Sequence, residues 1–319
     1  MQRNSANGEF GRDGNNMKIK TKETKMGDFI VIAICVFVIL LCIMPMLNLL
    51  AQSLSSSQSV INNKVSFLPV IHNHEKNEFH YGMTMESYRY VFLDPLFTRS
   101  MWWTAILTVI CTLFSLGMTI LCSYPLTYDW LKGKTFINTI IIFTMYFSAG
   151  TIPNYILMKS LNLLNNPLVL IIPNCLSVFN MIILRSFFFG IPDSLRESAE
   201  IDGANPFTVL VKIYLPLSAP VLATLALFYA VGRWNGFGDA LLYINAPQWV
   251  PIQLKLWQLI NNMTAIDIST VEMVAGTVPR TSDAIKAAAI MFATVPILIV
   301  YPWLQRYFIA GVTIGAVKG

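Results

Sequence analysis

Charged residues are scarce in this chain of 319 residues, of which only 12% are Asp, Glu, Lys or Arg. A soluble domain of ordinary composition carries about 25%. All five cysteines fall inside apolar runs, where they act as small apolar groups, so neither a disulfide framework nor a CxxC zinc site is indicated. With 55% hydrophobic residues, the composition favours a multi-spanning membrane protein. The net charge of +5 fits basic loops beside a membrane better than nucleic-acid binding.

A nucleotide-binding motif is also missing. Gly133-Lys134-Thr135 looks like the end of a phosphate-binding loop, but Tyr128 stands where that loop needs its first glycine. No cleavable signal peptide is expected, because the first apolar run is too long for one. Residues 1–16 are polar and unpatterned, and we expect them to be disordered or an added segment within an N-terminal tail of residues 1–27.

Apolar runs long enough to cross a bilayer core as helices recur along the chain. The sequence therefore predicts an all-α integral membrane protein whose residues 28–319 form a domain with six transmembrane helices. The predicted spans lie near Phe29–Ala51, Trp102–Cys122, Phe136–Met158, Leu168–Phe189, Leu217–Trp234 and Ala287–Leu304.

Basic residues predict the orientation of these spans. Residues 1–27 contain six of them, which favours an N-terminus in the cytoplasm. Six spans then place the C-terminus and the polar loop 193–216 on the same side. The longer loops 52–100 and 239–285 are predicted to lie outside.

The loop 193–216 has local signals for two short helices joined by a tight turn. Pro192 and Asp193 are typical of a helix start, and Gly203 is well placed to end that helix in a left-handed conformation. Asn205 then caps a second helix that has Pro206 at its first position. An inner apolar seam is predicted through Ile201, Phe207, Leu210, Val211 and Tyr214.

The stretch ESAEIDGANPFTVLVKIYLP, residues 197–216, resembles the "EAA" signature of ATP-binding-cassette (ABC) importer permeases. That signature reads E-A-A, three residues, G, nine residues, I-x-L-P, and Ser198 is the one departure from it here. Further stretches resemble the carbohydrate branch of the family: TMESYRYVF, RWNGFGDALLY and the C-terminal LQRYFIAGVTIGAVKG. MYFSAGTIPNYIL resembles the subgroup that imports complex oligosaccharides. The matching signature residues are Glu197, Ala199, Gly203, Ile213, Leu215 and Pro216.

The resemblance implies a type I importer permease fold in a bacterial plasma membrane, with loop 193–216 as the coupling helix that docks on an ATPase. It also implies partners: a second permease, two ATPase subunits that bind ATP and magnesium, and an extracytoplasmic solute-binding protein that delivers a sugar. No cofactor is expected in this chain, and it is not expected to be an enzyme. In this family the C-terminal tail can reach the ATPases, so Gln305 and Arg306 are candidate contacts.

Polar residues inside the fourth and fifth spans are candidates for the substrate pathway. An arginine within a span is costly in lipid and normally faces a cavity or a partner. Arg233 lies within the fifth span, and Asp239, about a turn and a half further along, could pair with it. The full set of candidates is Arg233, Trp234, Asn235, Asp239, Asn174 and Asn180.

Three alternatives remain open at this point. The segment HNHEKNEFH, residues 72–80, has the composition of a metal site, but its spacing matches no standard motif, so a polar loop is the better interpretation. A permease for amino acids or another small solute would share the EAA loop. An integral membrane enzyme is less favoured, because the predicted spans contain no paired carboxylates, histidine cluster or nucleophile arrangement.

Overall fold

The computed structural model describes residues 22–73, 78–266 and 282–316, and the chain divides into the units Met1–Asn48 and Leu49–Gly319. The expectation for residues 1–16 lies outside the described residues. Most of α1 (Lys22–Ser53) belongs to the first unit, and its side chains from Gly27 to Leu47 are exposed. Gly27–Ser53 is apolar and long enough to cross a membrane, as the sequence predicts.

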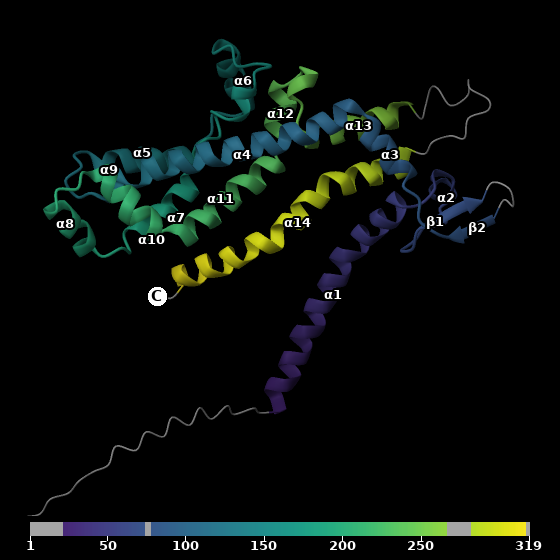
Figure 1. The fold of residues 1–319 in the computed structure, drawn as a ribbon, viewed down its shortest axis with the longest axis horizontal. Helices are drawn as coiled ribbons and strands as arrows, with labels where there is room; N and C mark the ends of the chain where they lie inside the picture. The colour runs from purple at the N-terminus through teal and green to yellow at the C-terminus, as the bar shows by residue number, and fades with distance from the viewer. Residues whose placement is uncertain (1–21, 74–77, 267–281, 317–319) are drawn as a thin grey trace, which may run out of the picture. The chain divides into compact units, whose positions relative to one another are not determined.

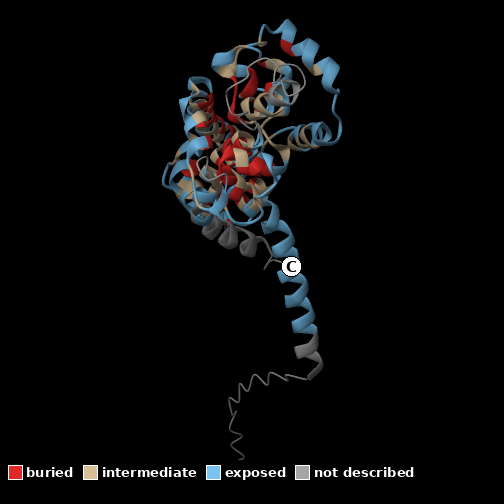
Figure 2. Ribbon diagram, turned by 90° about the vertical axis from the view of Figure 1, so that its right-hand side faces the viewer, coloured by how far each residue is buried: buried red, intermediate tan, exposed pale blue. Residues whose placement is uncertain are grey.

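The second unit is built around α11 (Ala219–Trp234), which packs against α4 (Pro95–Ser123) and α14 (Ser282–Ala316) (Figure 1). Asp94 starts α4, because its Oδ1 accepts a hydrogen bond of 2.9 Å from the backbone N–H of Leu96. Buried residues gather in the interior of this unit, and the outer faces of its helices are exposed (Figure 2).

Helices bent at short breaks make up the rest of the membrane-length segments. The bend between α5 (Lys134–Tyr146) and α6 (Thr151–Ser160) is 115°, and the bend between α7 (Val178–Phe188) and α8 (Asp193–Ile201) is 74°. A third break separates Pro206–Leu217 from α11 by 83°. Three described helices could cross a membrane alone, and up to six spans result if each bent pair counts as one.

The third predicted span, Phe136–Met158, is not one continuous helix. It breaks between α5 and α6, where Gly150 adopts a φ of +90°. A residue with a side chain rarely adopts that conformation, so the glycine allows the chain to turn sharply.

Short elements connect these helices. The first part of the second unit contains α2 (Ser57–Ile61), the antiparallel strands β1 (Val70–Asn73) and β2 (Glu78–Tyr81), and α3 (Glu86–Leu93). The remaining short elements are η1 (Pro125–Thr127), η2 (Pro167–Leu170), α9 (Pro206–Val209), η3 (Leu210–Tyr214), α10 (Leu215–Leu217), α12 (Gly238–Tyr243), η4 (Pro247–Trp249) and α13 (Ile252–Ile266).

A buried aromatic cluster joins the loop 193–216 to the ends of α4 and α7. We call it the tyrosine cluster and define it by Tyr124, Tyr128, Phe188 and Tyr214, all of which are buried. Aliphatic side chains complete it, among them Leu184, Val209, Leu210 and Leu225. A second buried cluster, which includes Leu107, Leu170 and Ala240, lies beside the pocket described below.

Candidate functional site

The loop 193–216 folds as the two capped helices that its sequence predicts. Gly203 has a φ of +83° and follows the end of α8, where the N–H of Ala204 donates to the carbonyl of Ala199 over 2.9 Å. Asn205 caps α9 through a 2.8 Å hydrogen bond from the N–H of Thr208 to its Oδ1. These contacts satisfy backbone groups that a helix end leaves free.

Charged side chains stiffen α8. The guanidinium of Arg196 lies 2.9 Å from Asp193 and 4.0 Å from Glu200, one turn away on either side. It also lies over the Tyr128 ring, 5.1 Å from the ring centroid, which ties α8 to the tyrosine cluster.

The predicted apolar seam of this loop is only partly correct. Leu210 and Tyr214 are buried, but Ile201 is 86% exposed, Phe207 is 67% exposed and Val211 is also exposed. The reason in α8 is geometric: Ala199 packs against the tyrosine cluster, and a residue two positions later points about 200° away around a helix. Ile201 and Phe207 therefore form an exposed apolar surface, which we call the knuckle surface.

The other predicted signature residues lie on the helices of the loop 193–216. Ile213 and Leu215 pack against the tyrosine cluster, and Pro216 lies in α10. Residues 210–214 form a single π-helical turn, a local widening that occurs often near functional sites. Glu197 lies on α8 and is exposed.

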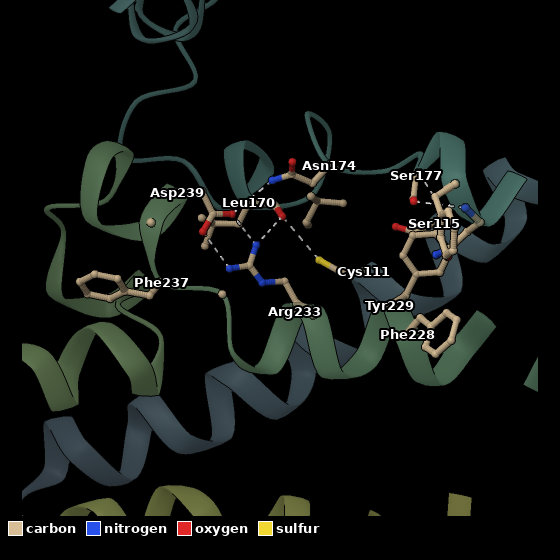
Figure 3. A pocket seen from close by; sticks show the side chains of 16 residues that line it. Cys111, Ser115, Leu170, Asn174, Ser177, Phe228, Tyr229, Arg233, Phe237 and Asp239 are labelled. Atoms are coloured by element: carbon tan, nitrogen blue, oxygen red, sulfur yellow. Dashed lines mark hydrogen bonds and ion pairs between the residues drawn. The ribbon is translucent and has the colours of Figure 1, made fainter. Parts of the chain in front are cut away.

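A pocket of about 750 Å³ lies where α4, α11, α12 and the segment 170–180 meet (Figure 3). Four of the predicted pathway residues line it: Asn174, Asn180, Arg233 and Asp239. The structure thus brings together residues that lie up to 65 positions apart in the sequence.

An ion pair occupies one side of this pocket. Arg233 is only 8% exposed, and its guanidinium binds Asp239 in a two-pronged contact, with Nη1–Oδ2 at 2.6 Å and Nη2–Oδ1 at 3.0 Å. Arg233 Nη1 also donates to the carbonyl of Leu170 over 3.1 Å, and Asp239 accepts from Ala240 N–H over 2.8 Å. Figure 3 shows the pair beside Asn174, whose Nδ2 lies 3.4 Å from Asp239 Oδ2. Such planar, double contacts are specific to arginine.

Gly236 makes room for this pair. It lies in the break between α11 and α12, and a Cβ atom at this position would lie 2.6 Å from Cζ of Arg233. Any other residue would force the guanidinium away from its present place. The predicted Arg233–Asp239 pair is present, but it joins two helices, α11 and α12, and does not lie along one helix.

Two predicted pathway residues do not line the pocket. Trp234 donates from Nε1 to the carbonyl of Ala293 on α14 over 3.3 Å and lines a separate apolar cavity. Asn235 donates back to the carbonyl of Val231 over 3.0 Å. Gln305 and Arg306 belong to α14, but their side chains lie outside the described residues.

Other residues of the pocket carry no signal in the sequence. Tyr229 and Phe228 on α11 and Ser115 on α4 line it, yet each lies within an apolar run. The Tyr229 hydroxyl is 2.6 Å from Thr119 Oγ1 and accepts a 3.1 Å hydrogen bond from the N–H of Ser177. Only the fold shows that this tyrosine joins α4, α11 and the start of α7.

The predicted absence of a metal site in segment 72–80 and of a phosphate-binding loop at Gly133-Lys134-Thr135 stays a prediction. In the hairpin His72 pairs with Phe79 and Ile71 with His80, so the two histidines lie on opposite faces; His74 and Glu75 are outside the described residues. Lys134 binds Asp129 over 2.9 Å, and this hydrogen bond lowers the pKa of the Asp129 carboxyl.

Residues 82–314 match the family described as the binding-protein-dependent transport system inner membrane component. The chain belongs to this family. It is therefore a multi-pass membrane protein of a transport system, which accounts for the many exposed apolar side chains on its helices.

Individual relatives of this permease cover nearly its whole length. It is 35% identical to the polygalacturonan/rhamnogalacturonan transport system permease protein YtcP of Bacillus subtilis, over 93% of this chain and 100% of that protein. It is 27% identical to the arabinooligosaccharides transport system permease protein AraQ of Halalkalibacterium halodurans, over 89% and 94%. A chain in the crystal structure of a bacterial ABC transporter involved in the import of the acidic polysaccharide alginate matches with a TM-score of 0.80 at 30% identity, over 90% and 98%.

Proposed function

We propose that this permease subunit passes a sugar oligomer or polysaccharide fragment through the pocket at Arg233 and couples its passage to ATP hydrolysis on partner subunits. The relatives that support the proposal are named for polygalacturonan/rhamnogalacturonan, arabinooligosaccharides and alginate. The observation that carries it is the chemistry of the pocket lining.

That lining combines hydrogen-bonding groups with exposed aromatic rings. Amide and hydroxyl groups of Asn174 and Ser177 can exchange hydrogen bonds with sugar hydroxyls. The rings of Phe179 and Phe228 offer apolar faces to the C–H side of a sugar ring. Binding pockets for small molecules combine these features and have volumes of about 300–1,000 Å³.

The knuckle surface fits the coupling role. Ile201 and Phe207 are large apolar side chains held in water by a stiff, capped loop, and apolar anchors of this kind dominate protein interfaces. We assign it to contact with an ATPase subunit, which binds the ATP and magnesium. The loop 193–216 and both chain termini then lie in the cytoplasm, and Gln305 and Arg306 remain further candidates for contact.

The remaining partners follow from the same assignment. A second permease completes the pathway within the plasma membrane. The external loops 52–100 and 239–285 receive a solute-binding protein that carries the sugar.

Uptake by the purified transporter in proteoliposomes tests the proposal. We expect accumulation of radiolabelled oligosaccharide that requires ATP and the binding protein. Replacing Ile201→Ser should lower both ATPase co-purification and uptake, because it removes an apolar anchor. Ile152→Ser changes an isoleucine on α6 that is 75% exposed, against 86% for Ile201, and should change neither. Uptake of amino acids in place of sugars would contradict the proposal.

A further inference from the structure

We propose that Tyr124 and Tyr229 are positioning residues that connect the loop 193–216 to the pocket through α4. The inference rests on the proposed function, since it explains how movement of the loop would reach the substrate. Neither tyrosine belongs to the EAA signature or to the predicted pathway. Tyr124 caps the end of α4 and its hydroxyl bonds to the loop, whereas Tyr229 lies on α11 and its hydroxyl bonds to Thr119 of α4.

The lower junction joins the end of α4 to the loop. The Tyr124 hydroxyl donates to the carbonyl of Pro206, the first residue of α9, over 2.9 Å. A hydroxyl has one proton, so the 2.6 Å contact between Tyr124 and Tyr128 has Tyr128 as the donor. Both tyrosines are buried, where a hydrogen bond has no competing water.

Aromatic packing makes this junction stiff. The Tyr214 ring at the end of the loop meets the rings of Tyr124 and Phe188 edge-on, with centroids 5.1 Å and 5.3 Å apart. Protein interiors of this kind are close-packed and transmit displacement. A push on the loop therefore moves the end of α4 with it.

The upper junction is at Thr119, five residues before Tyr124 and therefore about 7.5 Å back along the axis of α4. Thr119 Oγ1 donates to the carbonyl of Ser115 over 2.7 Å, so its 2.6 Å contact with Tyr229 has the tyrosine as donor. The Tyr229 oxygen in turn accepts the N–H of Ser177. One hydroxyl thus holds α4, α11 and the start of α7 together at the pocket wall, where Ser115, Ser177 and Tyr229 all contribute to the lining.

The inference makes a prediction about coupling efficiency. Replacing Tyr124→Phe removes one oxygen and keeps the ring. We expect the sugar transported per ATP hydrolysed to fall about fivefold, equivalent to ~1 kcal/mol, with assembly unchanged. Tyr229→Phe should act in the same direction, and the double variant should lose less than the product of the two, as for residues in one connected unit. Tyr81→Phe alters an exposed tyrosine in the hairpin and serves as the matched control.

A second readout needs no knowledge of the sugar. Phe179 is exposed in the pocket lining, so Phe179→Cys in a background with the five native cysteines replaced by alanine reports pocket access through maleimide labelling. We expect vanadate trapping of the ATPases to change the labelling rate, and Tyr124→Phe to reduce that change. Such a change in coupling, and not proximity alone, identifies a connecting residue.

Two outcomes would overturn the inference. One is a Tyr124→Phe transporter whose sugar-to-ATP ratio and labelling change equal those of the unaltered complex. The other is an equal loss in Tyr81→Phe. Failure of the proposed function looks different, because the unaltered complex would then show no ATP-dependent sugar uptake.

Discussion

The loop 193–216 and the pocket around Arg233 are built from contacts of different range along the chain. In the loop, the caps and ion pairs join residues three to five positions apart, as in the contacts of Arg196 with Asp193 and of Asn205 with Thr208. In the pocket, Arg233 reaches the carbonyl of Leu170 and Tyr229 reaches Thr119, 63 and 110 positions away. The turn and the caps of the loop come from local contacts, whereas the pocket exists only when four segments are assembled.

The largest effect is expected from a change to the locally built loop, at the turn of Gly203. Gly203→Val places a β-branched residue at a φ of +83°, which a branched side chain strongly opposes. We expect sugar uptake and substrate-stimulated ATPase activity to fall at least about tenfold while the protein still inserts. Backbone strain of ~1–3 kcal/mol at residue 203 would move the knuckle surface away from its docking position on the ATPase.

Gly203→Asn is the matched control. A Cβ atom at this position meets nothing within 4 Å, so the strain comes from the backbone alone. Asparagine tolerates the left-handed conformation better than other residues and should retain most of the activity. Normal transport by Gly203→Val would refute the coupling role of this turn.

The next largest effect is expected from a change to the long-range contacts of Arg233 in the pocket. Arg233→Lys keeps the charge but loses the planar fork that binds both oxygens of Asp239 and the carbonyl of Leu170. We expect normal insertion and basal ATPase activity with sugar uptake lower by about tenfold, since one or two charge-assisted hydrogen bonds of ~1.5 kcal/mol each are lost.

Asp239→Asn probes the same pair from its other side. It leaves the buried Arg233 without its counter-charge, so the stability of the purified complex should fall as well. Thermal unfolding of the complex and uptake are the two measurements. Full uptake by both variants would show that these charges only position the end of α11.

A smaller effect sharpens the comparison, because Gly236 is a local feature required by a distant contact. Gly236→Ala adds a Cβ atom that displaces the Arg233 guanidinium, and we expect uptake to fall severalfold. In an Arg233→Lys background the same change should have little further effect, since no guanidinium remains to be displaced. Additive losses in a double-mutant cycle would contradict this account.

The range of the contacts explains what the sequence could predict. Gly203, Asn205 and Pro206 are local signals, and their predicted roles as turn and caps are found in the structure. The burial of Ile201 was predicted incorrectly, because the side of α8 that packs inward depends on the tyrosine cluster and not on the helix itself. Tyr124 and Tyr229 could not be identified, since an apolar run containing a tyrosine looks the same whether or not its hydroxyl has a distant partner.

The pairing of Arg233 with Asp239 also has an electrical consequence. Moving one elementary charge through a membrane potential involves about 2.3 kcal/mol per 100 mV. The two opposite charges are held 2.6 Å apart and belong to the same stretch of chain, so they move together and their contributions cancel. Rearrangement of the described pocket lining therefore carries no net gating charge, and the membrane potential adds nothing to the energy of moving this pair.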